Sequence, residues 1–174
     1  MRTQSRSSCY SSKLPVCTSR EPTINIDTSE TSESYTVLIV DDNAEDRYLL
    51  KRFLLKTDLS IVVLEATSGR EGIDLLCSPL AKMQQDYPGL KTPIALFLDI
   101  NMPIMNGWEF VEELESRQDE IELKPTVVMM YSTSDADEEK RKAGNYQAVA
   151  GYIVKGESSP AVLQQAIIDA CTSL

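Results

Sequence analysis

Four short apolar runs in this chain each end in polar residues that such a run does not normally carry. The runs and the residues that follow them are 37–40 with Asp41 and Asp42, 94–98 with Asp99, 127–131 with Ser132, Thr133 and Ser134, and 151–154 with Lys155. Short runs rich in Val, Ile and Leu are typical of strands buried on both faces of a parallel sheet. Because parallel strands end at one common edge, we expect three carboxylates, a hydroxyl and an ammonium to meet there.

From Tyr35 onward, strand patterns alternate with helix patterns. Strands are expected at 36–41, 61–65, 94–99, 126–131 and 149–154, and helices at 44–57, from Ser68 through the mid-70s, at 107–116, at 135–143 and from Pro160 onward. Ser68 and Ser159 are suitable N-caps for two of these helices. Residues 78–92 resemble an added turn and a loop. Five β/α repeats of this length predict an α/β fold, a doubly wound five-stranded parallel sheet with right-handed crossovers.

The composition excludes several classes of function. The 174-residue chain contains no histidine, which rules out Ser-His-Asp and Cys-His catalysis and any His-ligated zinc site. Its net charge of −10 lies wholly on residues 35–174, because four basic and four acidic residues balance within 1–34. An acidic body argues against nucleic-acid binding, which needs a basic surface.

The sequence also indicates where the protein works. No run approaches the roughly 18–20 continuous apolar residues that a membrane-spanning helix needs, so no membrane association is expected. The cysteines show no metal-binding spacing and are Cys9, Cys17, Cys77 and Cys171. We therefore expect a reduced, cytoplasmic protein rather than a disulfide framework.

The first 34 residues differ from the rest. They hold nine Ser and five Thr with few large apolar residues, which predicts a disordered Ser/Thr-rich tail over 1–34 and one folded domain over 35–174. The first twenty residues are rich in Arg and Ser, as in organelle transit peptides, but no apolar helical face accompanies them. A plain extension and a start site placed too early are the alternatives.

The expected cluster of polar side chains has a definite chemistry. Taken singly, each of these residues has an ordinary structural role: the Asp41–Asp42 pair fits a turn, Asp99 an N-cap and Lys155 a solvated loop end. Their occurrence together, in order at the ends of strands, is much more specific for a functional site. Crowded carboxylates either raise a pKa or bind a cation, and oxygen ligands without Cys or His favour Mg²⁺. A cation, a lysine and a hydroxyl can neutralise the oxygens of a phosphoryl group in transfer. Asp99 is then the candidate nucleophile, forming an aspartyl phosphate.

The segments that carry these residues resemble the receiver domain of two-component response regulators. They are VLIVDDNAEDR at 37–47, LFLDINMPIMNGWEF at 96–110, VVMMYSTSDADEE at 127–139 and GYIVK at 151–155. The resemblance covers 35–174 and implies the flavodoxin-like (βα)5 fold of CheY-like proteins, with strand order 2-1-3-4-5. It further implies that the acceptor takes phosphate from a phosphohistidine on a separate sensor histidine kinase or histidine phosphotransfer protein.

The resemblance also implies roles for single residues. Asp99 would accept the phosphoryl group, and Asp41 and Asp42 would hold Mg²⁺ together with Asp99 and the backbone carbonyl of Asn101. Lys155 would contact the phosphate. Ser132 would be the switch hydroxyl, and Tyr152, three residues before the lysine, the aromatic that turns inward on activation.

Three features depart from the family pattern. Lys155 is followed by Gly156 where the family usually has proline, often after a cis bond; a cis bond before a non-proline residue costs about 3–4 kcal/mol, so a trans bond or a looser loop is expected. The loop at 78–92 is longer than in minimal receivers. The switch hydroxyl is ambiguous within 132–134, and Ser132 is chosen because Tyr131 ends its strand.

Three functions are compatible with these observations. The leading interpretation is a single-domain response regulator that signals by contact with an unknown protein target, as a monomer or weak homodimer. An alternative is a Mg²⁺-dependent aspartyl-phosphate phosphatase or phosphotransferase, but Asn101 stands where such enzymes typically carry a second acid. The third is a pseudo-receiver scaffold that takes no phosphate, which Gly156 leaves open.

Overall fold

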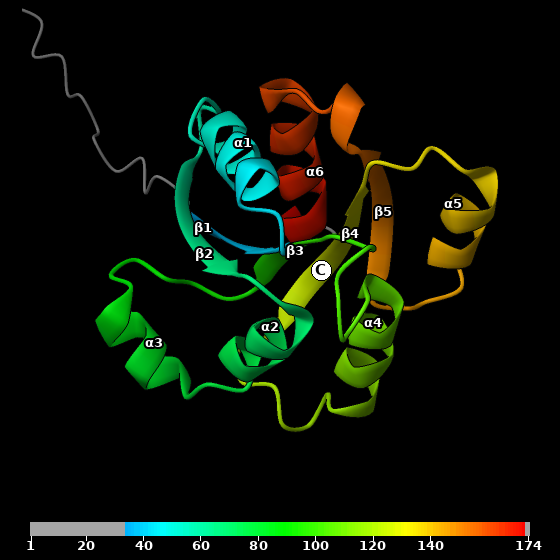
Figure 1. Cartoon of the computed structure of the whole chain (residues 1–174). Helices are drawn as coiled ribbons and strands as arrows, with labels where there is room; N and C mark the ends of the chain where they lie inside the picture. The colour runs from blue at the N-terminus through cyan, green and yellow to red at the C-terminus, as the bar shows by residue number, and fades with distance from the viewer. Residues whose placement is uncertain (1–33, 173–174) are drawn as a thin grey trace, which may run out of the picture. The chain divides into compact units, whose positions relative to one another are not determined.

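The computed structural model describes residues 34–172, except for the side chains of 125, 126 and 172 (Figure 1). Five parallel strands form one sheet in the order β2-β1-β3-β4-β5, which confirms the expected fold class and strand order. The strands are β1 Ser34–Val40, β2 Ser60–Ala66, β3 Ile94–Leu98, β4 Pro125–Ser132 and β5 Val149–Val154. The predicted disordered tail lies outside the described residues, apart from Ser34, which begins β1.

Six α-helices and one short 3₁₀ helix lie between or after these strands in the described part of the chain. The helices are α1 Ala44–Leu54, α2 Gly69–Leu76, α3 Leu80–Asp86, α4 Gly107–Ser116, α5 Asp137–Ala143, η1 Lys155–Glu157 and α6 Pro160–Thr172. Ser68 caps α2 as predicted, with its side chain accepting from the backbone N–H of Glu71. The Oγ atom of Ser159 accepts from the N–H of Val162 at 3.3 Å, as expected for the start of α6.

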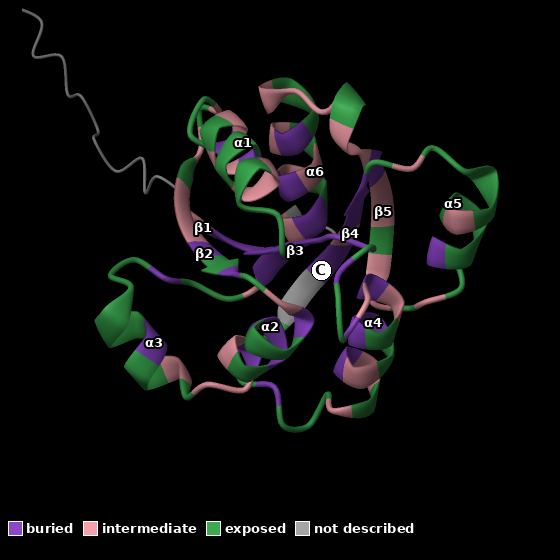
Figure 2. Ribbon diagram, in the orientation of Figure 1, coloured by how far each residue is buried: buried purple, intermediate pink, exposed green. Residues whose placement is uncertain are grey.

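Two apolar cores cover the two faces of the sheet, because successive strand residues point to opposite sides. On one face, residues of β1 and β3 pack with α1 and α6: Val37, Ile39, Ala95, Phe97, Leu50, Leu54, Leu163 and Ile167. On the other, their neighbours pack with α2 and α4: Leu38, Val40, Leu96, Leu98, Ile73, Leu76, Phe110 and Leu114. Figure 1 shows α1 and α6 on one side of the sheet and α2 and α4 on the other. Every residue of β3 is buried, which agrees with its central position (Figure 2).

Some boundaries differ from those expected. The segment 78–92 contains a helix, α3, whose Met83 is buried in the core, where we expected only a turn and a loop. Pro79 is the N-cap of α3, and the backbone N–H of Leu80 donates to Glu122 at 2.9 Å. The polar helix expected at 135–143 begins only at Asp137, and α1 ends at Leu54 rather than 57. No helix among the described residues is long and apolar enough to cross a membrane.

Replacing Phe110 by alanine should be strongly destabilising, because its ring is fully buried between α4 and the sheet. Core Phe→Ala substitutions lower the free energy of unfolding by about 3–5 kcal/mol. Leu55→Ala is the matched control, since Leu55 is 65% exposed and its loss should change stability little. Urea unfolding of both variants measures the difference, and equal midpoints would show that this core has been misassigned.

Candidate active site at the carboxyl edge of the sheet

The parallel register brings the predicted side chains to one edge of the sheet. Val40 and Leu98 are paired at the ends of β1 and β3, and the N–H of Asp99 donates to the carbonyl of Val40 at 2.9 Å. Asp41 and Asp99 therefore leave neighbouring strands at the same level. Ser132 is the last residue of β4, and Lys155 directly follows β5.

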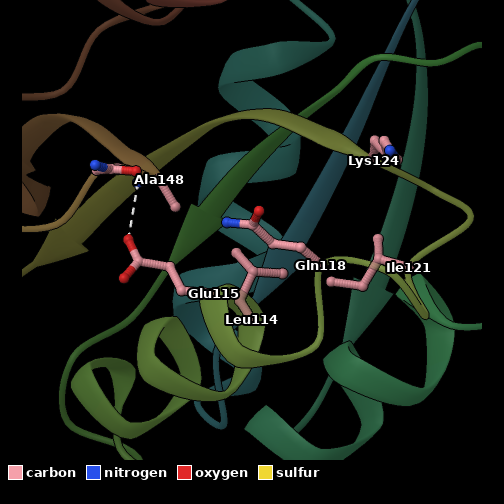
Figure 3. Close-up of a pocket in the computed structure, with 7 residues that line it drawn as sticks. Leu114, Glu115, Gln118, Ile121, Lys124 and Ala148 are labelled. Carbon is pink, nitrogen blue, oxygen red and sulfur yellow. Dashed lines mark hydrogen bonds between the residues drawn. The ribbon is translucent and has the colours of Figure 1, made fainter.

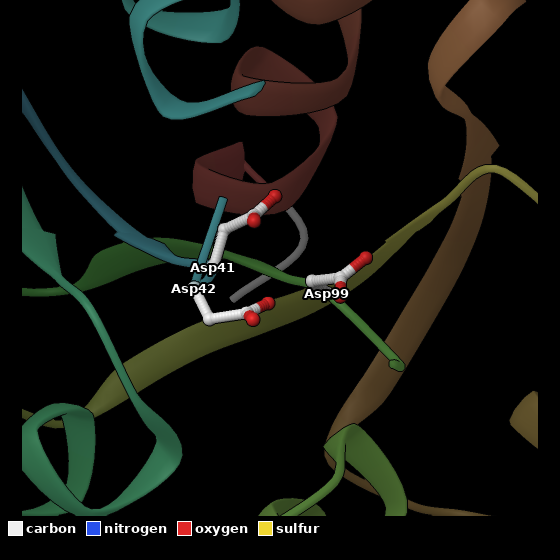
Figure 4. Close-up of side chains that lie close together, drawn as sticks. All are labelled: Asp41, Asp42 and Asp99. Carbon is white, nitrogen blue, oxygen red and sulfur yellow. The ribbon is translucent and has the colours of Figure 1, made fainter. Parts of the chain in front are cut away.

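Asp41, Asp42 and Asp99 form a cluster that could hold a cation. One oxygen from each carboxylate lies within 4.8 Å of the others, and Figure 4 shows the three side chains close together. Asp41 and Asp99 are buried, whereas Asp42 is exposed. Three clustered oxygen donors with one side open to solvent fit a small hard cation that keeps some of its waters, such as Mg²⁺.

The ammonium of Lys155 lies among three carboxylates. Its Nζ atom is 2.8 Å from Oδ2 of Asp41, 2.9 Å from Oδ1 of Asp99 and 2.7 Å from Oδ2 of Asp46. Lys155 reaches this position from beyond the far edge strand β5, and its side chain is only 10% exposed. Asp46, on the first turn of α1, was not predicted as part of the site. Its place one helical turn after the acid pair was the available signal.

The electrostatics of this cluster follow from burial and pairing. Burial raises the pKa of Asp41 above its ordinary value, and the hydrogen bonds from Lys155 and the N–H of Asn43 oppose that rise only in part. Burial alone would lower the pKa of Lys155. Its hydrogen bonds to the surrounding carboxylates outweigh burial, so the pKa of Lys155 is raised and the lysine stays protonated.

The backbone around Asp99 is fixed by the following loop. The N–H of Asn101 donates to Oδ2 of Asp99 at 3.0 Å, while the role of the Asn101 carbonyl stays a prediction. Gly107 begins α4 so close to Asp99 that a Cβ atom there would lie 2.6 Å from the Asp99 carbonyl oxygen. Between them, Ile104 has a φ of 71°, and the N–H of Met105 donates to the carbonyl of Pro103 at 2.8 Å. This is a tight γ-turn with a strained central residue, which the sequence did not indicate.

The two predicted switch residues lie on neighbouring strands. Ser132 is fully buried, and its Oγ atom accepts from the N–H of Ser134 at 3.1 Å. Tyr152 is half-buried on β5, with its hydroxyl 2.8 Å from the carbonyl of Ser134 and 2.9 Å from Oε2 of Glu139 on α5. Tyr152 therefore connects the loop after β4 to α5. Whether either residue moves stays a prediction.

Gly156 does not introduce a cis bond. The cis peptide bond among the described residues is Thr92–Pro93, so Lys155–Gly156 is trans. The hydroxyl of Ser158 donates to the carbonyl of Lys155 at 2.8 Å and lies 3.0 Å from the hydroxyl of Tyr131. Because the Ser158 proton is already used, Tyr131 is the donor of the second bond. This chain of hydrogen bonds holds the backbone of Lys155.

A separate cavity of about 260 Å³ lies away from these acids. It is lined by residues around the end of α4 and the segments preceding β4 and β5: Leu114, Glu115, Gln118, Ile121, Lys124, Gln147 and Ala148 (Figure 3). Glu115 accepts the backbone N–H of Ala148 at 3.0 Å across one side. None of the predicted site residues lines this cavity.

Comparison with known proteins identifies the family. Residues 37–168 match the response regulator receiver domain. The chain belongs to that family. Structures of receiver domains superpose on it: the chemotaxis protein CheY4 of Vibrio cholerae is 26% identical, with a TM-score of 0.54 over 79% of this chain and 99% of that one. The receiver domain of the histidine kinase CKI1 from Arabidopsis thaliana, complexed with Mg²⁺, is 25% identical, with a TM-score of 0.59 over 76% of this chain and 91% of that one.

Curated relatives of this receiver domain are larger proteins. The sensor histidine kinase CheAY of Helicobacter pylori is 29% identical over 158 residues, which is 89% of this chain but 18% of that protein. The nitrate/nitrite response regulator NarL of Escherichia coli K12 is 29% identical over 151 residues, which is 75% of this chain and 62% of that protein. The chain thus spans less than two thirds of the length of either relative.

Lys155→Met should destabilise the protein, because it removes the ammonium that pairs with the buried carboxylates of Asp41 and Asp99. Removing one partner of a buried ion pair costs about 3–5 kcal/mol. Lys140→Met is the control: Lys140 pairs with Asp135 on the surface, and exposed pairs contribute little. Urea unfolding in the presence of EDTA compares the two, and equal losses would contradict the structural importance of the Lys155 cluster.

Proposed function

We propose that this receiver domain accepts a phosphoryl group on Asp99 and signals by protein–protein contact. The observation that carries the proposal is the 2.9 Å contact between the protonated Lys155 and Oδ1 of Asp99, inside a carboxylate cluster that is open on the Asp42 side. A buried carboxylate beside a fixed positive charge is suited to a reaction in which negative charge accumulates on transferred oxygens.

The proposed reaction moves a phosphoryl group between two side chains. The bond between phosphorus and an imidazole nitrogen of a donor protein breaks, and a bond between phosphorus and a carboxylate oxygen of Asp99 forms. The described sequence contains no histidine, so we propose that the donor is a phosphohistidine of a partner, either a sensor histidine kinase or a histidine phosphotransfer protein. The likeness to the sensor histidine kinase CheAY supports this class of partner.

The donor set of the cluster fits Mg²⁺ as the resident cation. Asp41, Asp42 and Asp99 would hold it, with the Asn101 carbonyl as a further oxygen, and the Mg²⁺-bound CKI1 receiver domain supports this assignment. When bound, the cation supplies positive charge next to the phosphoryl oxygens. Lys155 supplies a second positive charge, and the Asn101 N–H holds the orientation of the Asp99 carboxylate through Oδ2.

The proposed signal begins with the hydroxyl of Ser132. A phosphoryl group on Asp99 would attract this hydroxyl, which now accepts a hydrogen bond from the N–H of Ser134, and that bond would break. Tyr152 is bonded to the same loop at the carbonyl of Ser134 and to Glu139 of α5, so a shift of the loop would reach α5. The face made by α5, β5 and α6 would then change shape for a downstream protein target. We further propose that the domain works in the cytoplasm, as a monomer or a weak dimer.

The geometry favours this function over the two alternatives. An aspartyl-phosphate phosphatase needs an acid as proton donor near the nucleophile, but the residue two positions after Asp99 is Asn101, whose side chain is exposed. A scaffold that takes no phosphate would not need the three acids and Lys155 to converge, and Gly156 does not prevent that convergence.

Asp99→Asn should abolish phosphorylation, because an amide cannot act as the nucleophile. Incubation of the wild type with Mg²⁺ and acetyl phosphate should add the mass of one phosphoryl group, and hydroxylamine should remove it. Trp108 fluorescence should also respond to Mg²⁺ and beryllofluoride, since its ring stacks on Tyr146 at 5.9 Å just beyond the active-site loop. Asp86→Asn, which changes an exposed acid at the end of α3, should behave as the wild type. A wild type that takes no phosphate would overturn the proposal.

Asp42→Asn should weaken Mg²⁺ binding while leaving the fold intact. A metal ligand is lost, and even residues that only support metal ligands change affinity by roughly 10- to 100-fold, so the dissociation constant should rise at least about tenfold. The metal-free variant should be slightly more stable than the wild type, because repulsion among the carboxylates is relieved. A Trp108 fluorescence titration with Mg²⁺ measures the affinity, and unchanged binding would remove Asp42 from the cation site.

A further inference from the structure

Asp46 contacts the ammonium of Lys155 from outside the proposed cation site. It lies on the first turn of α1, and its Oδ2 atom is 2.7 Å from Nζ of Lys155, the shortest of the three contacts made by that ammonium. Asp46 does not belong to the carboxylate cluster formed by Asp41, Asp42 and Asp99. Asp46 therefore contacts Lys155 but is not one of the proposed Mg²⁺ ligands.

Lys155 needs a partner for its side chain, because the contacts of the residues that follow it do not position the ammonium. A Cβ atom added at Gly156 would meet nothing within 4 Å, so no neighbouring group presses on the chain there. The hydrogen bond from Ser158 fixes the carbonyl of Lys155 but not its long side chain. A lysine ammonium on four flexible methylenes takes its position from the groups that accept its hydrogen bonds.

The three N–H donors of the ammonium match its three carboxylate partners. Asp41 and Asp46 accept two of them, and the third is directed at Oδ1 of Asp99. Asp41 is also a proposed cation ligand, and its other oxygen accepts the N–H of Asn43 at 2.8 Å. Asp46 is thus the partner that is committed to the lysine alone.

We propose that Asp46 is a positioning residue that holds the ammonium of Lys155 against Asp99 for phosphoryl transfer. This inference rests on the proposed function of Asp99. With two donors fixed on the α1 side, the third is already in place when a phosphoryl group arrives, so no reorganisation of the lysine is needed. The opposite role would be competition, in which Asp46 draws the ammonium away from the phosphoryl oxygens.

Three variants separate positioning from competition and from a merely structural role. Asp46→Ala removes the acceptor, whereas Asp46→Asn removes the charge but keeps a carbonyl oxygen that can accept from Nζ. Glu45→Ala is the matched control, because Glu45 is an exposed acid on the same first turn of α1. Both acids favour the helix N-terminus, so the two alanine variants share any loss of helix stability.

The readout is the phosphorylation rate constant of the full chain with acetyl phosphate at saturating Mg²⁺, which removes differences in cation affinity, with Tm measured for each variant. Asp46→Ala should be phosphorylated about tenfold more slowly, because small misplacements of a catalytic group can cost up to about 100-fold. Asp46→Asn should retain most of the wild-type rate, and Glu45→Ala should match the wild type.

The outcomes that overturn the proposal are distinct. An Asp46→Ala rate equal to or above that of the wild type would show that Asp46 does not position the lysine, or that it competes with phosphate. An Asp46→Asn rate as low as that of Asp46→Ala would assign the effect to charge rather than to the hydrogen bond. A wild type that takes no phosphate at all would instead overturn the proposed function, and this inference with it.

Discussion

The balance of charge around Lys155 is the interaction on which this site depends. Two of the carboxylates that meet its ammonium, those of Asp41 and Asp99, are buried at the ends of adjacent strands. Carboxylates left unpaired in such surroundings would either take up protons or oppose folding. The positive charge of Lys155, which follows β5, offsets the negative charge of these carboxylates. The order and register of the five strands bring the lysine and the acids together.

At this edge of the sheet, α4 next to Asp99 is packed more closely than α5, the helix proposed to change position on signalling. Behind Asp99, Gly107 brings the backbone of α4 into direct contact with the Asp99 carbonyl, and α4 buries Phe110 and Leu114 in the core. By contrast, Ala143 is the buried residue of the seven-residue helix α5. Elements with few buried contacts open at lower free energy than core elements. We therefore expect α5 to open at a lower free energy than α4.

Residue patterns predicted the sheet well because each buried strand is a short continuous apolar run, and Ser68 and Ser159 marked helix starts by their capping chemistry. Helix α3 was missed because a seven-residue helix with one buried side chain, Met83, leaves almost no periodic signal. The strained turn at Ile104 was missed for a different reason: β-branched residues rarely adopt positive φ, so only the surrounding loop can impose it. Asp46 was missed because its partner is distant in sequence.

The contact of Asp46 also explains how the chain tolerates Gly156 after its lysine. A proline would restrict the backbone around Lys155, but the trans Lys155–Gly156 bond leaves that task to hydrogen bonds at both ends of the residue. Ser158, itself bonded to Tyr131, fixes the carbonyl, and Asp46 on α1 and Asp41 directly after β1 fix the ammonium. The side chain and the backbone of Lys155 are thus both held by residues that lie close to the proposed cation and phosphoryl sites. If Asp99 takes a phosphoryl group as proposed, the contacts of Lys155 with Asp46 on α1 would change together with those at Asp99.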